Sequence, residues 1–105
     1  MKIACQLTDA AMAERKHGLQ EKVFAQVRKV EELQDGFRFH FDDDEQLLTN
    51  LFHYIQAEKA CCPFFQQEVV ICSHQEGIFW KVCGEEGTKE LLGEMLSTID
   101  FPKAD

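Results

Sequence analysis

Two adjacent cysteines, Cys61 and Cys62, are the residues of this chain whose type and spacing are best suited to chemistry. Glu58 precedes them by three and four residues, and side chains at these spacings are neighbours on one face of a helix. Thiol sulfurs suit thiophilic ions, and a bound metal cation deprotonates the thiols that hold it. The spacing therefore predicts that one carboxylate and two sulfurs meet near the end of a helix.

Glu58 occupies a position where the hydrophobic pattern asks for an apolar side chain. Leu48, Leu51 and Ile55 form an apolar stripe at helical spacing, and this stripe continues to Glu58 and then to Cys62. We therefore expect the carboxylate to point inward or sideways. A partly buried carboxylate is costly unless a donor or a cation compensates it. The candidate partners are a thiol proton, a backbone amide, a metal, Arg15, Arg38 and Lys81.

Four interpretations of the cysteine pair follow from its position at a helix end. A disulfide between adjacent residues is the least favourable, since their Cα atoms lie about 3.8 Å apart and ordinary disulfides need roughly 4.4 to 6.8 Å. A strongly activated nucleophile is disfavoured, because the negative end of the helix dipole and Glu58 both oppose thiolate formation. A soft metal or metalloid fits better, since the ion supplies positive charge. In the fourth interpretation the pair is structural and fills the corner where Pro63 turns a helix into a strand.

Two neighbouring cysteines rarely complete a metal site, so the metal hypothesis needs a third ligand. Cys83 lies at the end of a predicted strand and is the candidate that we favour. Glu58 offers a hard oxygen that is better suited to zinc than to a soft ion. The predicted metal ligands are Glu58, Cys61, Cys62 and Cys83, with Cys72, His53 and His74 as alternatives for the third position.

Two sequence motifs carry a resemblance to a known family. The run Ala-Glu-Lys-Ala-Cys-Cys-Pro-Phe-Phe occupies residues 57–65, and Gly-Glu-Glu-Gly-Thr-Lys-Glu occupies residues 84–90. Together they resemble an uncharacterised family of small bacterial proteins with a Glu-x-x-Cys-Cys-Pro-Phe motif and a Gly-x-Glu-Gly-Thr-Lys-Glu segment. The resemblance covers most of the chain and implies an α+β domain of unassigned activity, in a group connected with heavy-metal resistance and regulator-linked contexts. Gln67 departs from the pattern, because an aromatic or apolar residue is expected there.

The first half of the chain predicts a strand, a helix and a hairpin. Residues 2–7 form the strand, and Thr8 or Asp9 caps a helix that either stops at Gly18 or resumes beyond it. The hairpin turns at Asp35-Gly36, where we expect Gly36 to supply a positive φ. The three alternating phenylalanines that follow predict one buried strand face: Phe37, Phe39 and Phe41.

The second half predicts a helix, a second hairpin and a last helix. The acidic run 42–44 opens the helix that carries the cysteine pair, and Pro63 ends it. Strands are expected over residues 64–73 and 78–83, with Ile78, Trp80 and Val82 on one face and a turn at 74–77. The last helix covers residues 88–99, with Thr88 as its cap.

This order of elements predicts a single α+β domain over residues 1–105. The helix-plus-hairpin unit occurs twice and is followed by the C-terminal helix. Each alternating strand has one apolar face to bury, so we expect a mostly antiparallel sheet of four or five strands with helices packed on one face.

Composition excludes several classes of partner. Nineteen acidic and eleven basic residues give a net charge of −8, which repels nucleic acids and anionic membranes. The sequence contains no apolar run of the roughly 20 residues that cross a bilayer, and the start lacks a signal-peptide core. We therefore expect a cytoplasmic location. Five cysteines without an export signal then predict reduced thiols.

The sequence favours a small cytoplasmic protein whose vicinal thiols bind or sense a soft metal or metalloid ion. The alternative is a non-catalytic homodimeric interaction module in which the Cys-Cys-Pro segment is structural and an unpaired strand edge joins two copies. A thiol oxidoreductase is a third hypothesis, which is disfavoured because the helix dipole and Glu58 both oppose thiolate formation. The sequence shows neither a Ser-His-Asp order nor a nucleotide fingerprint, so it favours a non-enzymatic role and indicates no cofactor.

Overall fold

The computed structural model describes residues 10–72 and 77–98. The predicted strand at 2–7, the turn at 74–76 and the end of the last helix at Ile99 lie outside these residues. Within them, no helix combines the length and the apolar composition that crossing a bilayer requires. The elements are α1 (Ala10–Phe24), β1 (Lys29–Glu32), β2 (Gly36–Phe41), α2 (Glu45–Cys61), β3 (Gln66–Cys72), β4 (Gly77–Cys83) and α3 (Thr88–Ser97).

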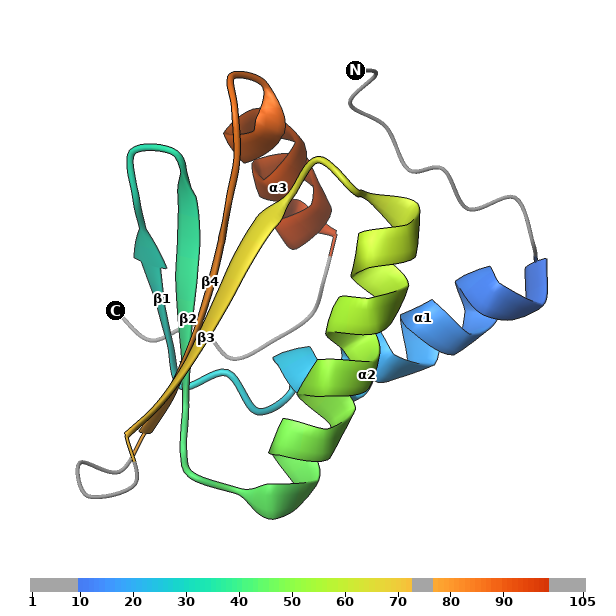
Figure 1. Cartoon of the computed structure of the whole chain (residues 1–105), viewed down its shortest axis with the longest axis vertical. Helices are drawn as coiled ribbons and strands as arrows, with labels where there is room; N and C mark the ends of the chain where they lie inside the picture. The colour runs from blue at the N-terminus through green and yellow to red at the C-terminus, as the bar shows by residue number, and fades with distance from the viewer. Residues whose placement is uncertain (1–9, 73–76, 99–105) are drawn as a thin grey trace.

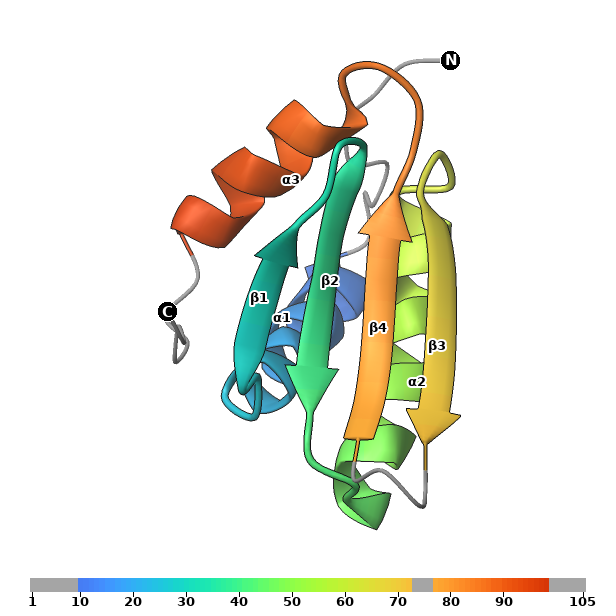
Figure 2. The same ribbon diagram turned by 90° about the vertical axis from the view of Figure 1, so that its left-hand side faces the viewer.

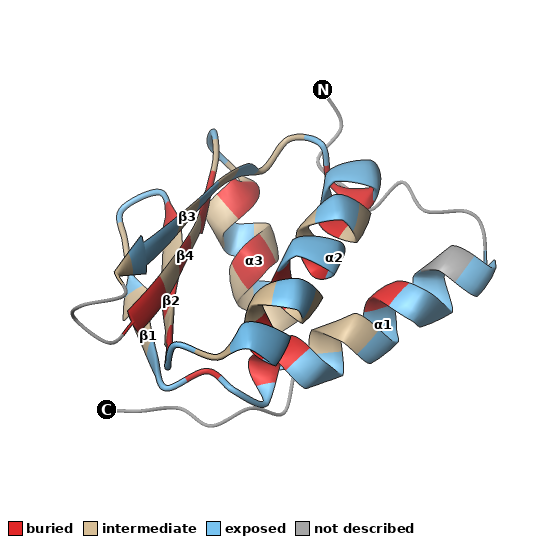
Figure 3. Cartoon of the chain, turned by 60° about the horizontal axis from the view of Figure 1, so that its bottom comes forward, coloured by how far each residue is buried: buried red, intermediate tan, exposed pale blue. Residues whose placement is uncertain are grey.

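The four described strands form one antiparallel sheet in the order β1-β2-β4-β3. This arrangement confirms the predicted α+β class and both hairpins, and β2 and β4 are the two central strands. Figures 1 and 2 show α1 and α2 on one side of the sheet, with α2 running behind β3 and β4. The buried residues gather between the helices and the sheet (Figure 3).

An aromatic cluster joins the helices to the sheet. Phe24 of α1 contacts Phe39 of β2 with ring centroids 5.3 Å apart, and Tyr54 of α2 contacts Trp80 of β4 at 5.7 Å. Both pairs are edge-to-face, a geometry that contributes about 0.5–1.5 kcal/mol beyond area burial. Trp80 Nε1 donates to Gln67 Oε1 at 3.0 Å. Gln67 therefore stands where an apolar residue was expected because a buried indole needs an acceptor.

Helix α2 has the boundaries that the sequence predicts. Asp44 is its N-cap, with extended backbone, and its carboxylate accepts from the Leu47 amide at 3.0 Å. The helix ends at Cys61, two residues before Pro63. The sequence left open whether the first helix stops at Gly18. In the structure α1 continues through Gly18 to Phe24, because packing of the helix against α2 outweighs the low helix propensity of glycine.

Two predictions about turn residues are wrong. Thr88 does not cap α3, because Gly87 holds the N-cap position with φ of 94° and Thr88 is the first helical residue. Among the described glycines only Gly87 has a positive φ, so Gly36 is not needed for such a turn. Gly36 instead lies opposite Cys83 in the β2–β4 ladder, and a Cβ there would stand 2.0 Å from the carbonyl oxygen of Val82. Close approach of two central strands requires this glycine.

Gly36→Ala is expected to destabilise the protein by about 3 kcal/mol, since the added methyl overlaps the backbone of β4. Gly18→Ala is the matched control, because nothing lies within 4 Å of its added Cβ. It should stabilise α1 by about 0.5–1 kcal/mol. Urea unfolding followed by circular dichroism measures both changes, and equal effects of the two substitutions would contradict the close-approach argument.

Candidate functional site

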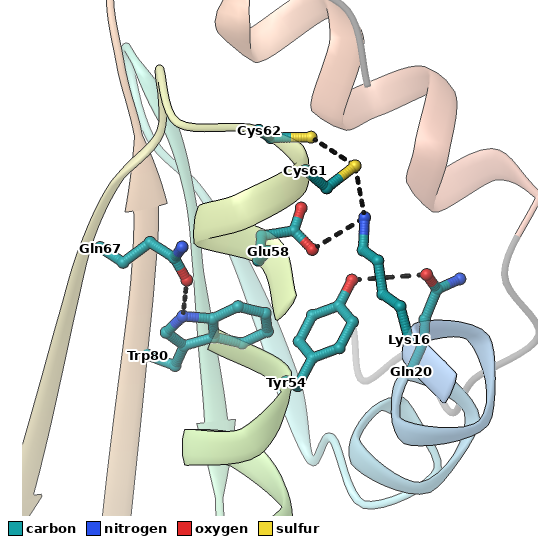
Figure 4. A network of polar contacts seen from close by, with 8 residues as sticks. All are labelled: Lys16, Gln20, Tyr54, Glu58, Cys61, Cys62, Gln67 and Trp80. Carbon is teal, nitrogen blue, oxygen red and sulfur yellow. Dashed lines mark hydrogen bonds and ion pairs between the residues drawn. The ribbon is translucent and has the colours of Figure 1, made fainter. Parts of the chain in front are cut away.

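The C-terminus of α2 places both cysteines at a corner of the fold (Figure 4). Cys62 is the C-cap, and its backbone N–H donates to the carbonyl of Glu58 at 2.6 Å. The amide of Phe65 then donates to the carbonyl of Cys62 at 3.1 Å, which turns the chain toward β3. Pro63 lies inside this turn, where its missing N–H costs nothing. The corner therefore holds two consecutive side chains on a backbone that is fixed from both sides.

Glu58 points into the protein, as its place on the apolar stripe predicts, and is only 2% exposed. Its partner is Lys16 of α1, which is 8% exposed and lies with Nζ 3.2 Å from Oε2 of Glu58. The predicted cations are wrong: Arg15 is exposed, Arg38 pairs with Glu31, and Lys81 pairs with Glu68.

Lys16 is the functional residue that sequence reasoning missed. It precedes the core residue Val23 by seven residues, or two helical turns, and so occupies a core position of α1, as Glu58 does in α2. Two charges of opposite sign at core positions of two helices are the signal that could have paired them. Lys16 also lies 6.0 Å from the centroid of the Tyr54 ring, whose hydroxyl donates to Gln20 at 3.4 Å.

The two sulfurs are close to each other but differ in state. Cys62 Sγ donates to Cys61 Sγ at 3.4 Å, and Lys16 Nζ donates to Cys61 Sγ at 3.3 Å. Cys62 is a free thiol, whereas Cys61 is disulfide-bonded. Cys61 and Cys62 are therefore not bonded to each other, and a disulfide between them was the interpretation that the sequence favoured least. The expectation of reduced thiols throughout is wrong for Cys61.

The electrostatic surroundings of the two sulfurs are also unequal. Burial raises the pKa of the Cys62 thiol to about 11, and the Glu58 carboxylate adds to this effect more than Lys16 opposes it. Burial and Glu58 also raise the pKa of Tyr54 well above its ordinary value. Cys61, by contrast, has the ammonium of Lys16 3.3 Å from its sulfur. The sequence analysis considered only the helix dipole and Glu58 as charges near the two thiols. It therefore omitted the ammonium of Lys16, which comes from another helix.

The remaining predicted ligands do not gather around the pair. Cys83 is a free, buried thiol beside a surface cavity of about 470 Å³ that Asp35 also lines, and burial followed by Asp35 raises its pKa. Cys72 is half-buried at the end of β3, and His53 is exposed. His74 lies outside the described residues. In residues 10–72 and 77–98, no three His, Cys, Asp or Glu side chains are arranged to hold a metal ion.

Comparison with models of protein families, with curated proteins and with solved structures gives no match for this chain. The chemistry of the site therefore has to be argued from its own residues.

Lys16→Met is expected to destabilise the fold by about 3–5 kcal/mol, because it leaves the buried carboxylate of Glu58 without its cation. The double variant Lys16→Met/Glu58→Gln removes both charges and should recover at least about half of that loss. Chemical denaturation of the wild type, both single variants and the double variant completes the cycle. Purely additive effects would show that the two side chains do not act as a pair.

The Cys62 thiol makes stability depend on pH in the alkaline range. An unfolded cysteine loses its proton near pH 8.5, whereas folded Cys62 keeps it to about pH 11. The unfolded state therefore binds fewer protons between these values, and the free energy of unfolding falls as pH rises through them. Cys62→Ala should have a shallower decline. Denaturation at a series of pH values tests this, and parallel curves for the two proteins would contradict it.

Proposed function

We propose that this protein binds a soft metal or metalloid ion through the sulfurs of Cys61 and Cys62, after reduction of the disulfide that holds Cys61. The observation that carries the proposal is the 3.4 Å separation of two sulfurs on a fixed helix end. Reduction frees the second sulfur at the same corner, so both ligands need only small side-chain rotations. A reducing compartment such as the cytoplasm would favour this form.

The spacing of the sulfurs favours a pyramidal ion over a linear one. With metal–sulfur bonds of about 2.3 Å, sulfurs 3.4 Å apart enclose an angle of about 95° at the bound ion. Trivalent arsenic and antimony form pyramidal thiolate complexes with angles near a right angle. Two-coordinate mercury and monovalent copper prefer a linear arrangement, for which the sulfurs would have to separate. The proposed ligand is therefore a trivalent metalloid.

Charge balance supports the same choice. Two thiolates and the Glu58 carboxylate would leave excess negative charge in a buried site, and a trivalent ion together with Lys16 offsets it. Glu58 is already paired with Lys16, so we propose that it holds that cation in place and is not itself a ligand. A third thiolate, from solution or from outside the described residues, completes the pyramid. Cys83 stays a predicted alternative for this position.

Titration of the fully reduced protein with arsenite, followed by native mass spectrometry and calorimetry, tests the proposal. We expect one arsenic per chain, and a loss of affinity of at least about 100-fold in Cys61→Ser and in Cys62→Ser, because each variant loses one arm of the chelate. Cys72→Ser is the matched control and should bind as the wild type does. Equal binding by the wild type and both pair variants would overturn the proposal, and loss in Cys83→Ser would identify the third ligand.

A second candidate function, a homodimeric interaction module, is favoured by the exposed edge of β3. This strand is at the edge of the described sheet, and its residues Val70 and Ile71 are 48% and 47% exposed. Antiparallel pairing with a second copy, centred on Val69, would set Glu68 opposite Val70 and so avoid facing like charges. The backbone N–H and C=O groups on the outer side of β3 would then form hydrogen bonds with β3 of the second copy.

Val70→Glu is expected to convert such a dimer into a monomer, because the new carboxylate would face Glu68 of the second copy. Val70→Lys, at the same exposed position, should keep the dimer because its ammonium faces that carboxylate. Light scattering coupled to size-exclusion chromatography, in reducing buffer, measures the mass. A wild type that is still monomeric at about 100 µM would rule out this module. This concentration is roughly a tenth of the millimolar effective concentration that a short flexible linker between two binding partners provides.

A further inference from the structure

The face of the sheet that points away from α1 and α2 carries a depression with charges of both signs and an apolar part. Figure 2 shows this face toward the viewer, with α1 and α2 behind the strands. The depression has a volume of about 410 Å³, within the range of small-molecule sites. Its lining comes from β2, β3 and β4 and consists of Arg38, His40, Glu68, Val70, Phe79 and Lys81. It shares no residue with the cysteine corner.

Two cations face each other in the charged part of the depression. Arg38 of β2 lies directly opposite Lys81 of β4, and like charges in such cross-strand pairs are destabilising. Arg38 has Glu31 at 3.6 Å, and Lys81 has Glu68 at 3.5 Å. Both separations exceed the roughly 2.7–3.2 Å of an N–H···O hydrogen bond. A carboxylate placed between Arg38 and Lys81 would therefore relieve their repulsion and find donors on both.

The apolar part lies next to these cations. Phe79 precedes Lys81 by two residues on β4, so both side chains are on the same face, about 6.8 Å apart along the strand. Val70 of β3 lies opposite Phe79 and is exposed. The ring of His40 meets the ring of Phe79 edge-to-face, with centroids 4.7 Å apart. An apolar group placed here would remove exposed hydrophobic surface from water.

We propose that this depression binds a free α-amino acid with an apolar side chain, and an aromatic one best. The α-carboxylate lies between Arg38 and Lys81, and the α-ammonium contacts Glu68. The side chain of the ligand covers Phe79 and Val70. Glu68 favours a zwitterion over a simple anion, because its carboxylate lines the same depression and needs a positive group opposite it. A zwitterion has no net charge, so the protein's charge of −8 does not repel it.

The ion pair of Lys81 and Glu68 matches the charged end of such a ligand. Lys81 Nζ and Glu68 Oε2 are 3.5 Å apart, and the ammonium and carboxylate of an α-amino acid are bonded to one carbon atom. Placed antiparallel, the two pairs form a ring of four alternating charges. Arg38 adds a second cation to the ligand carboxylate, and its planar guanidinium can bind both oxygens at once.

Titration of the isotope-labelled protein with L-phenylalanine, followed by the amide signals in NMR spectra, tests the proposal. We expect one molecule per chain with a Kd of about 1–3 mM, as is usual for a ligand of about a dozen non-hydrogen atoms. The shifted amides should belong to β2, β3 and β4. 3-Phenylpropionate lacks the ammonium and 2-phenylethylamine lacks the carboxylate, so each should bind at least about tenfold more weakly. Glycine, which keeps both charges and lacks the ring, should also bind more weakly.

The variants Lys81→Gln and Glu68→Gln should each weaken phenylalanine binding about tenfold, because each removes one charge of the ring. Lys89→Gln is the matched control. The side chain of Lys89 is 29% exposed, as is that of Lys81, and it also pairs with a glutamate, but it lies outside the depression. This variant should bind phenylalanine as the wild type does. Should Lys81→Gln fail to fold, Arg38→Gln takes its place.

Three outcomes would overturn the proposal. The first is the absence of amide shifts at about 20 mM phenylalanine, a concentration well above the expected Kd. The second is equal binding of 3-phenylpropionate and phenylalanine, which would mark a site for simple carboxylates. The third is wild-type binding in both Lys81→Gln and Glu68→Gln. Neither Cys61 nor Cys62 takes part, so the arsenite titration and this experiment can fail independently of each other.

Discussion

The ion pair between Lys16 and Glu58 is the interaction on which the site depends. Both side chains are buried, and removing two charges from water is favourable only when each one has the other within contact distance. Helix α1 must therefore cross α2 with Lys16 facing the last turn before the cysteines. A buried pair of this kind adds little net stability compared with apolar residues of the same size, but removal of one partner leaves the other charge buried and uncompensated.

The chemistry of the cysteine corner follows from this constraint. A helix C-terminus alone opposes negative charge on a sulfur, and the sequence predicted that effect for both thiols. The ammonium of Lys16 lies 3.3 Å from the Cys61 sulfur, while burial and Glu58 raise the pKa of the Cys62 thiol. Two neighbouring residues of one type thus differ in state, since Cys61 is disulfide-bonded and Cys62 is a free thiol. Metalloid binding would use both sulfurs once Cys61 is reduced.

The elements of the fold were predictable because their signals are local. Alternating phenylalanines, the acidic run 42–44 and Pro63 each act within a few residues, and the structure has the two hairpins and the α2 boundaries that they indicate. The errors arise where a distant segment decides. Gly36 serves the approach of β4 and not a positive φ, and Gln67 is explained by the indole of Trp80 across the ladder.

The candidate site was predictable only in part, for the same reason. The inward orientation of Glu58 and its proximity to the cysteines follow from spacing along one helix. The cation that pairs with Glu58 comes from a separate helix, and a charge at a core position looks like an interruption of the apolar pattern until the two helices are placed together. Spacing along the chain also carries no information on which sulfur is oxidised.

The aromatic cluster gives the molecule an internal optical reporter. Trp80 and Tyr54 are the single tryptophan and the single tyrosine of the chain, and their rings are in contact. Tyr54 is one helical turn from Glu58, and the indole spans the layer between α2 and the sheet. Ultraviolet emission from Trp80 therefore originates beside Tyr54, one helical turn from Glu58, and changes in the packing of this layer can be followed without attaching a dye.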